Sequence, residues 1–253
     1  MVSILEAIRS ALDDKAAHAT RVSAEAYFKG AIRFIGVKRP GVTAVERSVR
    51  PAFAALTPSQ RKHAALALLR SPFMEERQIG IDVLAKEIKK LPDSILDDVE
   101  ALFDTVVSDW ATCDTLCGKI LRPLIVRSSA ARRRIVGWST HENIWKKRAS
   151  AVAFVNEARK GTHDNDIVKV CTRIVKDPER FVQLGCGWVL RELFLADAKR
   201  VDAFIVHNAG SFSREGLRYA IEKMPAAQQR RLLDMHAAAA QPRRAPRSGR
   251  KRA

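Results

Sequence analysis

Three short stretches place aromatic rings beside charged side chains, and chemistry could reside there. Trp110 and Asp114 stand four residues apart in SDWATCD, so on a helix they project from one face. In NIWKKR, Trp145 and Arg148 share one side of a helix start that carries three consecutive cations, and Trp188 belongs to WVLRE. An indole face and a carboxylate together would bind a cation, whereas Arg and Lys at helix starts would bind phosphate.

A structural interpretation competes with this one, because most Trp residues in helices are buried. It assigns Trp110 and Trp188 to core packing and Asp114 to a helix surface. Familiar enzyme motifs are missing: the sequence has no P-loop, no GxGxxG after a strand, no GxSxG and no HExxH. The four cysteines form no CxxC, and we expect buried free thiols and no metal site.

Helices must position these residues, because strand signals are almost absent. Ile4, Ile8 and Leu12 form an apolar stripe at helical spacing, and Thr57 followed by proline predicts a capped helix start. Helical pairs recur at intervals typical of HEAT-like repeats. We therefore predict an all-α, HEAT-like helical-repeat solenoid with a basic concave face, a compact helical bundle being the alternative. One domain is expected over 1–238, followed by a disordered basic tail over 239–253.

The charge balance indicates a polyanionic partner. Lys and Arg number 45 against 28 Asp and Glu, a net charge of +17. Six of these cations lie in 242–253, so the rest of the chain still carries +11. Nucleic acid is the expected partner and an anionic membrane surface the lesser alternative. No apolar window is long enough to span a bilayer, and the first ten residues lack a signal-peptide pattern, so we expect a cytoplasmic protein.

The same stretches, in the same order, resemble the DNA alkylation repair family, the AlkD-type DNA glycosylases with HEAT-like repeats. The resemblance rests on AYFK at 26–29, FIGVKRP at 34–40 and the Trp-x-x-x-Asp pattern of 110–114. It continues through WKKR at 145–148 and WVLRE at 188–192. It implies a C-shaped stack of helical repeats that holds duplex DNA in a basic groove. The implied activity is hydrolytic removal of N3- or N7-alkylated purines by a monomer without metal or organic cofactor.

The resemblance also implies residue roles. Asp114 would be the catalytic carboxylate, Trp110 and Trp188 would line the deoxyribose of the lesion, and Arg148 would grip a nearby phosphate. Tyr27 would face the groove, and we expect DNA contacts from the basic residues of the matching stretches, Lys29, Lys147 and Arg191. Gly187 departs from the family, where serine often precedes the second Trp, and we expect this change to be tolerated.

The expected mechanism follows from the charge of the lesion. Alkylation at N3 or N7 makes the purine cationic, so the base leaves as a neutral molecule without a general acid. A carboxylate and two indole faces would then stabilise an oxocarbenium-like sugar. No buried lysine is needed, so we expect a monofunctional glycosylase without lyase activity in base excision repair. The alternatives are a non-catalytic HEAT-repeat protein that binds branched DNA or RNA, and a protein–protein scaffold.

Overall fold

The structure, a computed structural model, describes residues 2–240. Its regular elements there are helices, accompanied by one isolated β-bridge between Arg33 and Phe73, so the predicted all-α class is confirmed. The chain divides into two compact units, Met1–Asn156 and Glu157–Ala253, which are described separately below. A single domain over 1–238 stays a prediction. The last helix runs on to residue 240, and the basic tail beyond it lies outside the described residues.

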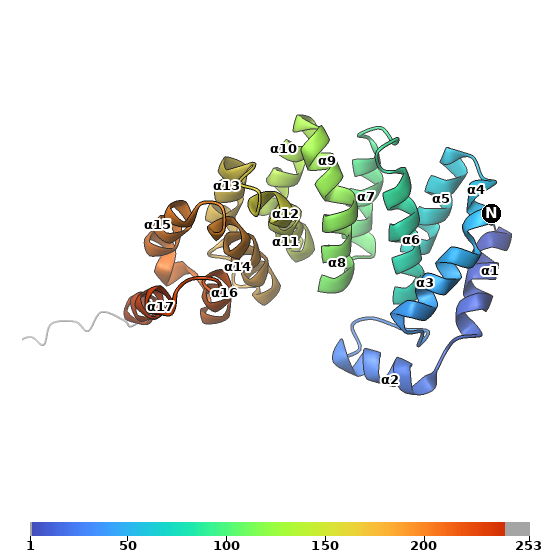
Figure 1. Cartoon of the computed structure of the whole chain (residues 1–253), viewed down its shortest axis with the longest axis horizontal. Helices are drawn as coiled ribbons and strands as arrows, with labels where there is room; N and C mark the ends of the chain where they lie inside the picture. The colour runs from blue at the N-terminus through green and yellow to red at the C-terminus, as the bar shows by residue number, and fades with distance from the viewer. Residues whose placement is uncertain (1, 241–253) are drawn as a thin grey trace, which may run out of the picture. The chain divides into compact units, whose positions relative to one another are not determined.

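The first unit is built from short helices in pairs (Figure 1). In chain order they are α1 (Val2–Asp13), α2 (His18–Tyr27), α3 (Arg39–Ser48), α4 (Arg50–Ala54), α5 (Pro58–Leu69), α6 (Met74–Glu87), α7 (Ile95–Thr105), α8 (Trp110–Leu116), the π-helical turn η1 (Cys117–Leu121), α9 (Arg122–Arg127), α10 (Ser129–Gly137), the 3-10 turn η2 (Trp138–Thr140), α11 (Ile144–Val152) and α12 (Val155–Ala158), which crosses into the second unit. Helix α6 packs against α5, α3 and α8, and α8 packs in turn against α11.

Several helix starts are fixed by side-chain caps, among them the start at Thr57 that the sequence predicts. The Thr57 side chain accepts from the Gln60 amide at 3.2 Å, and the Gln60 side chain bonds back to Thr57, which completes a capping box before Pro58. The side chain of Asp109 caps α8 by accepting from the Thr112 amide, and that of Asn143 caps α11 by accepting from the amides of Trp145 and Lys146. The helices that carry the aromatic and charged stretches of the first unit therefore begin at defined residues.

The helix that begins at Trp110 changes its winding after Leu116. At η1 the amide of Arg122 donates to the carbonyl of Cys117, five residues earlier, in place of the α-helical partner. Proline at 123 has no N–H to donate, so one of the regular backbone hydrogen bonds of the α-helix is missing there. The π turn absorbs this interruption and lets the helix continue into α9.

The core of the first unit is mostly aliphatic, with three phenylalanine rings, those of Phe53, Phe103 and Phe154, and one indole. Trp138 is 3% exposed and packs on Phe103 with ring centroids 5.3 Å apart.

The four cysteines of the two units are buried and free, as predicted: Cys113, Cys117, Cys171 and Cys186. Within residues 2–240, no helix is both long enough and apolar enough to cross a bilayer.

The second unit continues the helical pairing with α13 (Asp164–Ile174), α14 (Arg180–Phe194), α15 (Ala198–Asn208), the 3-10 turn η3 (Ala209–Ser211), α16 (Arg214–Ala220) and α17 (Ala226–Ala240). Helices α14 and α16 approach each other closely through two glycines. A Cβ on Gly187 would lie 2.6 Å from the carbonyl oxygen of Gly216, and a Cβ on Gly216 would lie 2.9 Å from Oε1 of Gln183. Backbone contact at this distance leaves no room for a side chain.

We expect Gly187→Ala to destabilise the protein by about 1–3 kcal/mol, because the added methyl must push α14 away from α16. Thermal and urea unfolding would measure the loss. Gly137→Ala is the matched control, since nothing lies within 4 Å of its Cβ position. Equal stability of the two variants would contradict a packing role for Gly187.

Candidate functional site

Helix α8 presents Trp110 and Asp114 from one face, and a buried aspartate fixes where this helix begins. Asp109 is 3% exposed and accepts from the Thr112 amide at 2.7 Å and from its hydroxyl at 2.8 Å. Nη1 of Arg77 lies 3.5 Å from the second carboxylate oxygen, while Nε of Arg77 donates to the Ser71 carbonyl at 2.7 Å. The start of α8 is thus tied to α6 and to the turn before it.

Asp114 forms a two-pronged ion pair with Arg148 of α11. Nε of Arg148 donates to Oδ1 at 2.8 Å and Nη2 donates to Oδ2 at 2.9 Å. The Arg148 side chain is 6% exposed and that of Asp114 15% exposed. The paired arrangement fixes the orientation of the carboxylate as well as its charge.

Burial and pairing act on Asp114 in opposite directions. Burial raises the pKa of Asp114, the hydrogen bonds and charge of Arg148 lower it, and nearby Asp109 raises it slightly, with a net pKa above the ordinary 3.8. Burial lowers the pKa of Arg148, but the hydrogen bonds and charge of Asp114 outweigh this, so its pKa is raised. Arg148 is therefore the permanent cation that keeps a partly desolvated carboxylate ionised.

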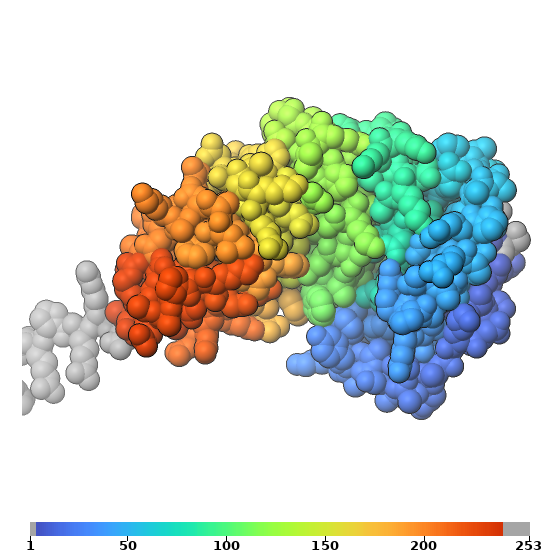
Figure 2. Space-filling model, viewed as in Figure 1, coloured from blue at the N-terminus to red at the C-terminus, as the bar shows by residue number. Residues whose placement is uncertain are grey.

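An aromatic cluster surrounds Trp110. Its indole stacks on Phe28 with centroids 5.4 Å apart and meets the edge of Tyr27 at 6.4 Å, and Phe28 in turn contacts Phe34 at 5.6 Å. Trp110 is half-buried, whereas Tyr27 is 70% exposed. These contacts seat the end of α2 against the first turn of α8, as the space-filling view also shows (Figure 2).

A buried carboxylate holds the loop that brings Phe34 to this cluster. Glu75 is 2% exposed and accepts three backbone N–H groups, those of Ile35, Gly36 and Val37, at 2.8–3.0 Å. Gly36 adopts φ +106°, and its carbonyl accepts from the Ala17 amide at 3.0 Å, at the start of α2. Since no α2 residue is fully buried, this loop and the aromatic contacts are what hold the helix.

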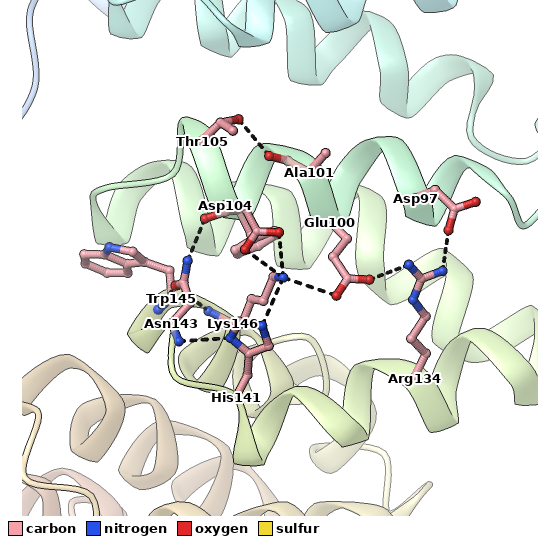
Figure 3. Close-up of polar contacts among 11 residues, drawn as sticks. Asp97, Glu100, Ala101, Asp104, Thr105, Arg134, His141, Asn143, Trp145 and Lys146 are labelled. Atoms are coloured by element: carbon pink, nitrogen blue, oxygen red, sulfur yellow. Dashed lines mark hydrogen bonds and ion pairs between the residues drawn. The ribbon is translucent and has the colours of Figure 1, made fainter.

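Lys146, two residues before Arg148, is a buried cation held by three groups. It is 2% exposed, and its ammonium lies 2.8 Å from Asp104, 3.2 Å from Glu100 and 3.4 Å from Nε2 of His141 (Figure 3). These contacts anchor α11 to α7. The same stretch is fixed at its start, where Asn143 donates to the Phe103 carbonyl at 2.8 Å.

The second unit holds two of the predicted site residues. Trp188 is half-buried on α14. Arg191, one turn later, pairs with Glu222 at 2.9 Å and Glu192 at 3.0 Å and lies over the ring of Tyr219 at 4.5 Å. Whether Trp188 meets Trp110 and Asp114 stays a prediction.

The structure thus brings together Trp110, Asp114 and Tyr27, and it adds Arg148 as the direct partner of Asp114. The phosphate contact that the resemblance implied for Arg148 stays a prediction. Lys29 is exposed at the end of α2 in a left-handed conformation with φ +52°, and Lys147 is half-buried on α11. Their DNA contacts stay predictions.

Sequence reasoning missed three positioning residues, Asp109, Glu75 and Arg77. The helix-cap rule could have identified Asp109, which directly precedes Trp110. Glu75 and Arg77 gave no such signal. The amides that Glu75 binds lie 38 to 40 residues away in the sequence, and Asp109, the partner of Arg77, belongs to another helix pair.

Comparison with known proteins defines the class of fold and then the family. The structure resembles that of a predicted DNA alkylation repair enzyme from Enterococcus faecalis, with a TM-score of 0.72 over 84% of this chain and 98% of that one. At 17% sequence identity this likeness shows a shared helical-repeat fold. No curated protein sequence matches the chain. The sequence profile of the DNA alkylation repair enzymes matches residues 8–224, so the chain belongs to that family.

We expect Asp109→Ala to lower the free energy of unfolding by about 2 kcal/mol or more, because it removes a helix cap and leaves Arg77 without its buried counterion. Urea denaturation measures the loss. Asp197→Ala, which removes the more exposed cap of α15, is the control and should cost about 1 kcal/mol. A loss at Asp109 no larger than at Asp197 would show that the buried network adds nothing.

Proposed function

We propose that this protein is a monofunctional DNA glycosylase that hydrolyses the N-glycosidic bond of cationic N3- or N7-alkylated purines in duplex DNA. The observation that carries the proposal is the Asp114–Arg148 pair, which holds an ionised carboxylate on the same helix face as the half-buried indole of Trp110. Membership of the DNA alkylation repair enzymes supports it.

The reaction needs charge stabilisation more than proton transfer. When the bond between C1′ and the alkylated purine breaks, its electron pair neutralises the base, and positive charge develops on the sugar. A water oxygen then bonds to C1′ and loses a proton to Asp114 or to solvent. The carboxylate of Asp114 and the face of Trp110 would stabilise the sugar cation, and we propose Trp188 as a second indole face. No metal or organic cofactor has a part in these steps.

Arg148 has a different role in this proposal from the phosphate grip expected from the sequence. Its Nε and Nη2 groups are bonded to Asp114, so it acts as a positioning residue that keeps the carboxylate charged and correctly turned. The exposed Lys29, just after α2, and the half-buried Lys147 of α11 would contact phosphates. The net charge of +17 supplies the general attraction for DNA.

Lyase chemistry requires an amine that reaches C1′ of the sugar. Lys146 is the buried lysine beside Arg148, but it is 2% exposed and its ammonium is bound by Glu100 and Asp104. An amine held in this way is inaccessible to a sugar, which supports release of the base without strand cleavage.

We expect Asp114→Asn to reduce single-turnover release of 7-methylguanine from methylated duplex by roughly 10²-fold or more, with little change in DNA affinity, because it removes a preorganised charge and keeps the shape. Base release is measured by chromatography and affinity by fluorescence anisotropy. Asp97→Asn, which changes an exposed carboxylate of the neighbouring α7, is the control and should match the wild type. Undiminished release by Asp114→Asn would eliminate the proposed role. Duplex binding by the wild type without any base release would favour the non-catalytic alternative.

The pH dependence of excision should report on the ion pair. Because the pKa of Asp114 is raised by burial and lowered by Arg148, excision should fail on acidification above the pH expected of an ordinary carboxyl group. Arg148→Gln removes the lowering influence, so the acid limb of the rate profile should move to higher pH. Arg134→Gln, which breaks an ion pair with Asp97 and Glu100 instead, should leave the limb unmoved. If the acid limb of the rate profile lies at the same pH in Arg148→Gln as in the wild type, Arg148 does not control the ionisation of Asp114.

A further inference from the structure

Gly118 lies one helical turn after Asp114, within the π turn η1. The burial pattern defines the outward side of this segment: Ala111, Asp114 and Gly118 are half-buried, whereas Cys113 and Cys117 are fully buried. Gly118 therefore continues the face that carries Trp110 and Asp114.

No packing contact explains a glycine at this position. A Cβ built on Gly118 has no atom within 4 Å, and the residue does not adopt a positive φ. Glycine in a helix lowers stability by about 1 kcal/mol relative to alanine. The packing of the folded chain does not require glycine here, so this loss of stability has no structural cause.

The other glycines of the first unit have reasons within the fold. Gly30 and Gly36 have φ of +75° and +106°. Cβ atoms on Gly41 and Gly80 would lie 2.7 Å from a Val37 methyl carbon and 2.8 Å from the Ala65 carbonyl oxygen. Gly137 shares the open surroundings of Gly118 and also has a negative φ, of −60°, but it is the last residue of α10, so the cost of glycine in a helix interior applies to it less.

The surroundings of Gly118 suit a polyanion that comes close to the helix. Lys119 follows it with a side chain that is 43% exposed and paired with Asp82, and Arg122 lies half-buried one turn later. Glycine lets a ligand backbone approach a helix more closely than any other residue does, and cations nearby would attract phosphates.

We propose that Gly118 is a close-approach position for the sugar–phosphate backbone of bound DNA, beside the nucleotide that faces Asp114. The absent side chain admits the strand to within contact of the helix, so that the sugar can reach the carboxylate. This inference rests on the proposed function for the identity of the ligand.

The test compares Gly118→Ala with Gly137→Ala, because each adds one methyl group to an open helical position. Both variants should melt at or about 2 °C above the wild type, since alanine favours the helix. Gly118→Ala should weaken binding of an undamaged duplex by about tenfold and slow release of 7-methylguanine by at least as much, because the methyl displaces the strand. Gly118→Val should be worse in both assays, and Gly137→Ala should match the wild type.

The outcomes separate this inference from the proposed function. Wild-type base release with unaltered binding and release in Gly118→Ala would overturn the role of Gly118 and leave the function standing. If the wild type binds duplex without releasing bases, and Gly118→Ala binds duplex more weakly, the proposed function is overturned and the close approach at Gly118 stands. A clear fall in melting temperature in Gly118→Ala would show that the π turn itself requires glycine, and would also overturn the inference.

Discussion

The arrangement of the site depends on one buried electrostatic pair. A guanidinium as buried as that of Arg148 is stable only with a counterion, and the carboxylate of Asp114 is partly desolvated in its turn. Each group therefore requires the other, and both helices that carry them are fixed at their starts, α8 by Asp109 and α11 by Asn143. The two caps fix the helices that carry Asp114 and Arg148. The contact of Arg77 with Asp109 adds to this at α8, and the contacts of Lys146 with α7 add to it at α11.

Much of the fold and part of the site could be predicted from the sequence. Helical periodicity and the Thr57–Pro58 start are local signals, and they gave the all-α class and a correct helix start. The four-residue spacing of Trp110 and Asp114 correctly placed them on one face. The phosphate role that the resemblance implied for Arg148 stays a prediction, whereas its ion pair with Asp114 was missed because the partner lies 34 residues away and no local pattern records such a contact. The Glu75 clamp escaped prediction for the same reason.

The indoles show why residue type alone could not decide between core and site. Trp138, which drew no attention in the sequence, is the indole buried in the core of the first unit, whereas Trp110 and Trp188 are half-buried. Trp110 is distinguished by the residues around it: Phe28 and Tyr27 cover part of the ring, and Asp114 lies one helical turn away. Partial cover leaves an indole rigid and still accessible, which a cation-binding face requires.

The unequal exposure of the pair determines which charge a ligand meets. The carboxylate of Asp114 is more exposed than the guanidinium of Arg148, so the outer member of the pair is negative and the inner member positive. On a protein with a net charge of +17 this creates a local reversal of sign within surroundings that attract phosphates. Under the proposed function, phosphates would be drawn to the surrounding cations, while a sugar that becomes positive would be drawn to Asp114. Discrimination by developing charge needs no pocket shaped to the base, and so it suits lesions that share a positive charge and differ in size.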